Sequence, residues 1–320
     1  MEHPRNTFTA GVVNAMQRLY PLEYADSAWD NVGLLLGNLE ETEPFRNRVL
    51  LTTDLTASVV DEAIQYDVSV IVAYHPIIFR GLKAITPADT QQASLLRLAQ
   101  KNIAVYCPHT ALDAAKGGLN DWLADKVEEA AAEAVGTAAH VLDGSRRTTL
   151  KPVRGPESVV GYGRQVDLPV AVDAFALVRS FAQRLGGMRH VLIAPPADYR
   201  DGLDVAEHLL VRSVAVCAGS GSDVLKAATS AKMLLTGEMS HHDVLAAVSR
   251  NRWVVCVLHS NSERLFLAET LQAQLQHRLA AGHDDAKVLV SQNDHDPFLF
   301  WDVSEPPPSG QKPLPAACAI

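Results

Sequence analysis

The stretch from Arg48 to Pro76, RVLLTTDLTASVVDEAIQYDVSVIVAYHP, decides the fold of this chain. It begins with an apolar run at 48–53, continues with helical spacing at 57–66, for which Thr56 is the expected N-cap, and ends with an apolar run at 68–74. Two strands joined through a helix form a parallel pair, and a strand that is apolar on both faces is buried on both sides. The stretch therefore predicts an α/β fold built on a mostly parallel sheet.

The same alternation of helices and strands continues along most of the chain. Further helices are predicted at 7–20, 91–101, 119–132, 174–185, 241–249 and 262–276, and further strands at 103–107, 190–194, 214–218, 232–236, 253–258 and 288–291, with a loop at 109–118. Residues 140–169 carry little periodic signal and several Gly and Pro residues, which indicates a connection or a small sub-domain.

These patterns predict the organisation of the whole chain. We expect a first α/β lobe at 1–139 and a second part at 140–303, in which the middle connection and a second α/β lobe are intertwined with the first lobe. The last stretch, 304–320, is Pro-rich and is predicted to be a flexible tail.

The composition is that of a soluble globular protein. Of 320 residues, 48% are hydrophobic and 20% are charged, and the formal net charge of -9 argues against direct nucleic-acid binding through a general basic field. No apolar run reaches membrane-spanning length, and the first residues lack the pattern of a secretory signal. A cytoplasmic protein is expected, with nuclear and mitochondrial pools left open. The four cysteines form no CxxC motif and are interpreted as buried free thiols.

Four polar side chains stand where apolar runs end. His75 follows the run at 68–74, Asp113 comes after the strand at 103–107, and His259 and Glu263 come after the strand at 253–258. The carboxyl ends of parallel strands meet at one edge of a sheet, where open α/β folds bind ligands. Imidazole nitrogens and carboxylate oxygens are ligands of zinc, manganese and iron, so the set predicts a metal site.

Each of these residues also has a structural interpretation. A His at the end of a strand is often structural, Asp113 would cap a turn, and Glu263 would favour a helix N-terminus that Asn261 or Ser262 caps. His109 is a second potential ligand beside Asp113. Taken together, the three strand ends favour a metal.

Two further segments follow strands. In GEMSHH at 237–242, the side chains of Glu238, His241 and His242 are candidates for supporting a ligand or transferring a proton, or are surface groups on a first helical turn. The turn AGSGSD at 218–223 is either a phosphate cradle or a plain strand-to-helix turn.

Six ordered segments of the chain resemble the Nif-three-like family, which is often described as GTP cyclohydrolase type-2-like. They are WDNVGL at 29–34, AYHPIIF at 73–79, PHTALD at 108–113, AGSGS at 218–222, TGEMSHH at 236–242 and HSNSE at 259–263. The resemblance extends from about Trp29 to Pro297, and six short motifs in the same order make it specific.

The resemblance implies a two-lobed α/β fold with mixed, mostly parallel sheets, a dinuclear metal site in a cleft between the lobes, and a ring-shaped homo-oligomer, commonly a hexamer. His75 matches the second His of the family's His-His-Pro motif, Asp113 its Asp, and His259 and Glu263 its late His and bridging Glu. One or two divalent ions per chain are implied, with zinc, manganese or iron expected. Trp29, Asp30 and Glu238 would line the cleft.

Tyr74 departs from the pattern of many bacterial members, which have the first His at this position, and agrees with eukaryotic members. A phenol with a pKa of about 10 is a poor ligand near neutral pH. We therefore expect one tight and one weak metal site, and Tyr74 or water would complete the second site if it is filled.

Two functions follow from the resemblance. The first is a metal-dependent, cyclohydrolase-like hydrolase of a small nucleotide-like or phosphorylated substrate, with Glu263, His109 and Glu238 as candidate catalytic residues. The second is a non-catalytic metal-binding regulatory protein with a transcription-related protein partner, which the family's name suggests. The sequence leaves open whether the chain is an enzyme.

Overall fold

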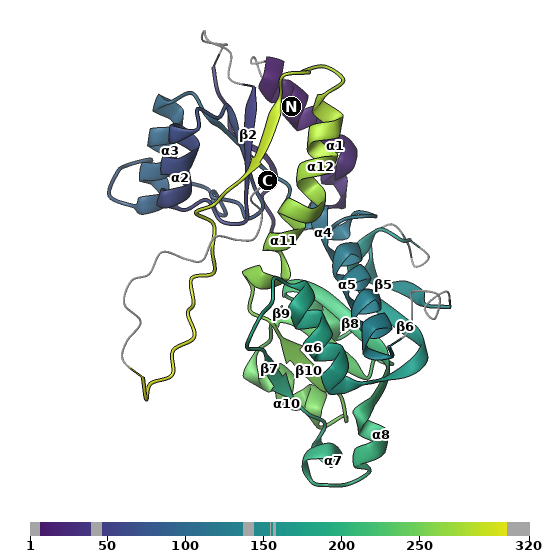
Figure 1. Ribbon diagram of the computed structural model, residues 1–320. Coiled ribbons are helices and arrows are strands. Elements are labelled where there is room, and N and C mark those ends of the chain that lie inside the picture. The colour runs from purple at the N-terminus through teal and green to yellow at the C-terminus, as the bar shows by residue number, and fades with distance from the viewer. Residues whose placement is uncertain (1–6, 40–46, 137–143, 154, 156–157, 306–320) are drawn as a thin grey trace. The chain divides into compact units, whose positions relative to one another are not determined.

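The computed structural model describes residues 7–39, 47–136, 144–153, 155 and 158–305, and the chain divides into two compact units (Figure 1). Unit 1 comprises residues 1–16, 31–108 and 267–320, and unit 2 comprises residues 17–30 and 109–266. The chain thus passes between the units four times. Residues 109–136, which the sequence assigns to the first lobe, belong to unit 2. Most of the predicted tail, at 306–320, lies outside the described residues.

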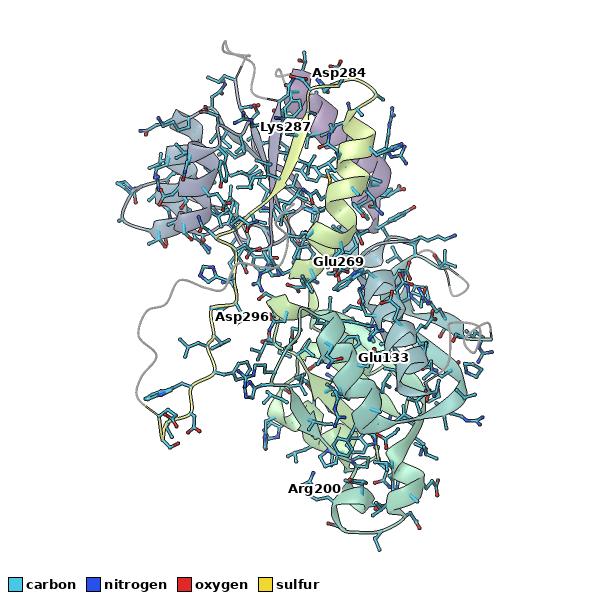
Figure 2. All side chains as sticks on the ribbon, in the orientation of Figure 1. Glu133, Arg200, Glu269, Asp284, Lys287 and Asp296 are labelled. Atoms are coloured by element: carbon cyan, nitrogen blue, oxygen red, sulfur yellow. The ribbon has the colours of Figure 1, made fainter. Side chains whose placement is uncertain are left out.

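Unit 1 is built on a five-stranded sheet with the order β1-β4-β3-β2-β11. Its strands are β1 (Gly33–Leu36), β2 (Arg48–Thr52), β3 (Val70–Ala73), β4 (Ala104–Cys107) and β11 (Lys287–Val290), whose first residue is labelled in Figure 2. All neighbours pair in parallel except the edge strand β1. Figure 1 shows α2 (Ala57–Gln65) and α3 (Thr90–Gln100) on one side of this sheet, and α1 (Thr7–Leu19) and α12 (Gln272–Leu279) on the other.

The stretch that opens the chain's alternation folds as predicted. Every residue of β3 is buried, and Thr56 caps α2 by accepting a hydrogen bond from the backbone N–H of Val59. Leu50, Ile71 and Val105, on three adjacent strands, face the same side and pack against α2 and α3 in one core. Because strand residues alternate, their neighbours fill the opposite face. Burial on both faces explains why these strands read as unbroken apolar runs.

The last strand of unit 1 is anchored by a buried carboxylate. Glu62 on α2, only 3% exposed, accepts hydrogen bonds from the Ser291 hydroxyl at 2.5 Å and from the backbone N–H groups of Gln292 at 2.8 Å and Asn293 at 3.2 Å. Asp294 accepts a further hydrogen bond, at 2.6 Å, from the backbone N–H of Thr53. The segment after β11 is therefore attached to α2 and to the end of β2.

Unit 2 contains a six-stranded sheet with the order β5-β6-β8-β9-β10-β7. Its strands are β5 (Arg146–Pro152), β6 (Gly161–Asp173), β7 (Leu192–Ala194), β8 (Leu210–Ser220), β9 (Met233–Glu238) and β10 (Trp253–Cys256). The central strands β8, β9 and β10 pair in parallel, and the outer pairings are antiparallel. Both sheets are mixed, as predicted.

The helices of unit 2 position its loops. α5 (Leu119–Ala134) packs on α6 (Ala174–Arg184) and on β6 and β8, whereas α9 (Ser222–Leu225) and α10 (His241–Val248) share a core with β8, β9 and β10. Short helices complete the unit: a 3-10 turn at Leu22–Tyr24, α4 (His109–Ala114), α7 (Ala197–Arg200), α8 (Val205–Leu209), a 3-10 turn at Ser260–Ser262 and α11 (Arg264–Phe266).

Three local predictions differ from the structure. The described part of 140–169 contains β5 and most of β6, neither of which was predicted. β5 lies at the sheet edge, alternates exposed with half-buried residues and has mostly polar side chains, and β6 contains Gly161, Gly163 and Pro169. The expected loop at 109–118 contains the short helix α4. The helix expected over 262–276 is a 3-10 turn, α11, a π-helical turn at Leu267–Leu271 and α12, which ends at Leu279. No helix within the described ranges is long and apolar enough to cross a membrane.

Replacing Glu62 by Ala is expected to lower the free energy of unfolding by about 1–3 kcal/mol, because two backbone donors and a hydroxyl would lose their acceptor. Chemical denaturation measures this loss. The control is Gln65→Ala, an exposed position on the same helix, which should change the stability by less than about 0.5 kcal/mol. Equal effects of the two substitutions would contradict the anchoring role of Glu62.

Candidate metal centre

His75 lies in unit 1, two residues after the end of β3. Its backbone N–H donates to the carbonyl of Thr53, at 3.0 Å, which extends the pairing of β3 with β2. Its Nδ1 lies 2.9 Å from Oδ1 of Asp54, which follows β2. Because β2 and β3 are parallel neighbours, their carboxyl ends bring the two side chains together. The bond at Nδ1 fixes the ring and leaves Nε2 as the nitrogen that would bind a metal.

His259 has the same environment in unit 2. It follows β10, and its Nδ1 lies 2.9 Å from Oε1 of Glu238 at the end of the parallel neighbour β9. The residue before it, Leu258, has a φ of 68°, a strained conformation for a bulky side chain. Such strain persists only where the surrounding structure imposes it, and it occurs often at functional sites. Here it turns the chain sharply so that His259 leaves the sheet.

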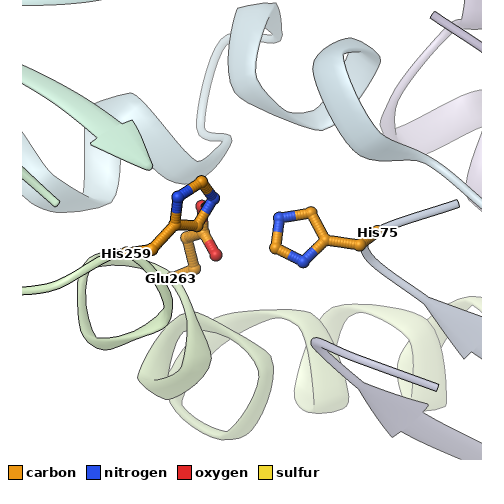
Figure 3. A group of neighbouring side chains, drawn as sticks. All are labelled: His75, His259 and Glu263. Carbon is orange, nitrogen blue, oxygen red and sulfur yellow. Dashed lines mark ion pairs between the residues drawn. The ribbon is translucent and has the colours of Figure 1, made fainter. Parts of the chain in front are cut away.

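Glu263 lies beside His259. Its carboxylate is only 3% exposed, and its Oε1 is 3.4 Å from Nε2 of His259 (Figure 3). Ser262 does not serve as an N-cap, because its hydroxyl donates to the carbonyl of His259 at 2.6 Å and accepts from the N–H of Gly219 at 2.8 Å. The imidazole that Glu238 orients therefore presents its second nitrogen to a buried carboxylate.

Two glycines permit this close packing. A Cβ on Gly219, which has a φ of 59°, would lie 2.6 Å from Oε1 of Glu263 and 3.0 Å from Nε2 of His259. A Cβ on Gly237 would lie 2.7 Å from the carbonyl oxygen of Gly219. The turn at 218–223, one of whose interpretations is a phosphate cradle, thus presses its backbone against the His259 and Glu263 side chains.

A third histidine is paired in the same way, again in unit 2. Nδ1 of His109 lies 2.7 Å from Oδ1 of Asp30, whose side chain is fully buried. The backbone N–H of Thr110 donates to the other Asp30 oxygen, at 3.2 Å, and so does the Thr110 hydroxyl. Burial alone would raise the pKa of Asp30, but the hydrogen bond and charge of His109, together with Thr110, hold it below its usual value. Asp30 is therefore ionised at neutral pH and orients His109.

Asp113 lies one helical turn after His109 on α4 and is half-buried. Burial raises the pKa of the Cys217 thiol, and the negative charges of Asp113 and Glu263 raise it further. Both carboxylates therefore lie within electrostatic range of the same buried side chain of β8. This raised pKa also keeps Cys217 protonated, and the side chain is a buried free thiol, as interpreted from the sequence.

The remaining sequence candidates occupy different settings. His241 and His242 are exposed on the first turn of α10, with ring centroids 5.4 Å apart. Tyr74 in unit 1 is only 4% exposed, and its ring is tilted against that of His75, with centroids 4.8 Å apart. Asp54 was not singled out from the sequence, although its place directly after a predicted strand is the signal that identified His75.

Gly219→Ala is expected to weaken metal binding at least about tenfold, because the added methyl group would displace Glu263 and His259 from their positions. The matched control is Gly187→Ala, also in unit 2, whose φ of 74° imposes the same backbone strain but whose Cβ would meet no atom within 4 Å. Titration of both variants with Zn²⁺ or Mn²⁺ separates the effect of the close contact from the effect of backbone strain. If both variants bind the ion equally well, the close contact at Gly219 does not shape the site.

Comparison with known proteins identifies the family. The family model described as Duf34/NIF3 (NGG1p interacting factor 3) matches residues 9–297. The chain is 42% identical to the protein NIF3 homolog of Schizosaccharomyces pombe over 291 residues, 88% of this chain and 94% of that protein. It is 36% identical to NGG1-interacting factor 3 of Saccharomyces cerevisiae over 90% of this chain and 95% of that protein. A Bacillus cereus protein related to NIF3 shares its fold, with a TM-score of 0.69 at 23% identity over 91% of this chain and 98% of that chain. The chain therefore belongs to the Duf34/NIF3 family, as the six sequence segments indicated.

Proposed function

We propose that this chain is a divalent-metal-dependent hydrolase of a small nucleotide-like or phosphorylated substrate. The observation that carries the proposal is the repeated pairing of an imidazole Nδ1 with a carboxylate at His75 and His259, with the buried Glu263 beside His259. Ligand histidines usually make this second hydrogen bond, which sets the tautomer and the direction of the free nitrogen. A buried carboxylate next to an imidazole also fits a cation, whose charge would offset the cost of burial.

The proposed ligands of the tight site are His75 of unit 1 and His259 and Glu263 of unit 2, which match the ligand positions that the family resemblance implies, and each offers one ligand atom. Two imidazole nitrogens and a carboxylate oxygen suit zinc, manganese or iron. Asp113 is the proposed additional ligand for a second ion. This ion is expected to bind more weakly, because Tyr74 replaces the imidazole that it would need. We expect about one tightly held ion per chain.

An ion bound there would supply Lewis acidity and a water molecule of lowered pKa. The residues of the chain perform the other steps. Asp54 and Glu238 hold the two imidazole rings, and Glu263 provides a buried carboxylate oxygen beside His259. His109, oriented by the ionised Asp30, is the proposed group for proton transfer to or from the substrate.

Elemental analysis of the purified chain is expected to find about one zinc, manganese or iron ion per chain, because the phenol of Tyr74 is a poor ligand near neutral pH. Tyr74→His should raise the ratio toward about two by restoring an imidazole. A ratio near zero in the wild-type chain, measured without added chelator, would overturn the metal proposal.

Glu238→Gln is expected to weaken metal affinity by about 10- to 100-fold, because an amide holds the His259 ring less firmly than a carboxylate does. Competition with a chromophoric chelator measures the change. Glu207→Gln, an exposed carboxylate on α8, serves as the control and should leave the affinity unchanged. Equal affinities of the Glu238 variant and the wild-type chain would contradict the proposed orientation of His259.

Glu263→Gln is expected to abolish hydrolysis of a nucleotide panel with added Mn²⁺, Zn²⁺ or Mg²⁺, by about 100-fold or more, with the circular dichroism spectrum unchanged. The amide keeps the size of the carboxylate but removes its charge. The wild-type chain treated with a chelator and then reloaded with metal is the positive control. Full activity of the Gln variant would refute a role for Glu263 in the reaction.

The second candidate function is a metal-binding interaction protein. It is favoured by one finding: the relative from Saccharomyces cerevisiae is named NGG1-interacting factor 3. The wild-type chain and the Glu263→Gln variant also distinguish the two proposals. If neither the wild-type chain nor the Glu263 variant hydrolyses any nucleotide, and both capture a protein partner equally well, the hydrolase proposal fails and the interaction role is favoured.

A further inference from the structure

Trp29 is not among the proposed metal ligands, yet its half-exposed ring lies against that of His109. We propose that its indole ring is the platform on which a planar nitrogen-containing ring of the substrate stacks, with the edge of that ring directed to His109. The inference rests on the proposed function, since it names the part of the substrate that would be held beside the same reaction site. It adds a base-binding subsite within unit 2.

The geometry around Trp29 is fixed by its neighbours. The backbone N–H groups of Trp29 and Asp30 both donate to the carbonyl of Asp26, at 3.4 Å and 3.0 Å. The N–H of Asp26 in turn donates to the hydroxyl of Thr110 on α4, at 3.0 Å. The turn that carries Trp29 is therefore attached to the start of the helix that carries His109.

The Trp29 ring is nevertheless open to solvent. Its exposed fraction is 50%, and its ring meets that of His109 edge to face, with centroids 5.7 Å apart and an interplanar angle of 84°. A large aromatic ring that is held in place yet half exposed is a surface on which bases stack, independently of their identity. The perpendicular imidazole then borders this surface.

His109 gives the subsite a polar side. Its Nδ1 is engaged by Asp30, so the neutral ring carries its proton on Nδ1 and offers Nε2 as a hydrogen-bond acceptor. The N–H groups at the edges of nucleobases match such an acceptor. The conformation of His109, with a φ of 27°, is strained for a residue with a side chain, which fits an orientation imposed by function.

The charges favour a neutral ring over a phosphate group at this position. Asp30 directly follows Trp29, Asp26 lies three residues before it, and Asp113 lies one helical turn from His109. A phosphate would be repelled by these carboxylates, whereas a neutral base would not. Asp113 and Glu263 both act on Cys217, so the carboxylates connect this subsite to the metal ligands of unit 2. The phosphate is therefore expected on the metal side and the base on the Trp29 side.

Tryptophan fluorescence tests the subsite directly. The full chain, purified with its own metal, is titrated with AMP, GMP, CMP and UMP, and with ribose 5-phosphate as the matched probe without a base. Trp122 and Trp253 are buried, and the chain offers one other exposed indole, Trp301, at 48% against 50% for Trp29. We expect the nucleotides to quench the wild-type chain and Trp301→Phe, and Trp29→Phe to lose most of the quenching. Ribose 5-phosphate should quench none of them.

Affinity measured by calorimetry provides the second readout. Trp29→Ala should weaken nucleotide binding by about 5- to 150-fold, the range expected for one lost base–aromatic stack, and should change ribose 5-phosphate binding less than about twofold. Trp29→Phe keeps an aromatic surface and should restore most of the nucleotide affinity. A loss of affinity for both probes would indicate a structural role of Trp29 and overturn the proposal.

Two further outcomes would also overturn it: no quenching of the wild-type chain by any nucleotide, or undiminished quenching in Trp29→Phe. Failure of the hydrolase proposal gives a different result, namely nucleotide binding that depends on Trp29 in a chain that hydrolyses none of the four. If the chain instead hydrolyses a phosphorylated compound that lacks a base, and Trp29→Ala does so at the wild-type rate, the hydrolase proposal stands and the subsite does not.

Discussion

The hydrogen bond between an imidazole Nδ1 and a carboxylate oxygen is the interaction on which the chemistry of this chain depends. It occurs at His75 with Asp54, at His109 with Asp30 and at His259 with Glu238. In each pair the histidine lies two or three residues after the end of a strand. In two of the pairs the carboxylate lies at or just beyond the end of the parallel neighbouring strand. The parallel strand pairs thus do more than form cores. Their register determines which acid meets which imidazole, and so which nitrogen is left for a ligand.

This arrangement requires strained or side-chain-free backbone positions. Leu258 and His109 adopt positive φ values, and Gly219 and Gly237 leave no room for a side chain where β8, β9 and β10 end. Ser262 links these loops by bonding to His259 and Gly219 at once. The surrounding sheet holds the strained residues in place, because every residue of β10 and every residue of β9 except Glu238 is buried.

The sequence predicted the parts of the structure that depend on local pattern. The strand at 68–74 and the helix at 57–66 follow from apolar periodicity and from a capping Thr, and His75 and His259 follow from their places after strands. The pairing of His75 with Asp54 could not be predicted, because it depends on which strands are neighbours and in what register. β5 escaped prediction because an edge strand needs no apolar alternation. The role of Gly219 is likewise invisible until the chain is folded.

The pairing of β11 with β2 has a consequence for how the protein forms on the ribosome. Lys287 pairs with Arg48, so the pairing at the edge of the first sheet cannot form until a segment more than 200 residues later has been synthesised. At about 5–20 residues per second, this delay is on the order of 10–50 s. The whole of 109–266 emerges in the meantime and can collapse around its own strands. Until β11 arrives, β2 presents an edge of unpaired backbone N–H and C=O groups with which another chain could pair, and the nascent chain is most exposed to aggregation and most dependent on chaperones during this interval.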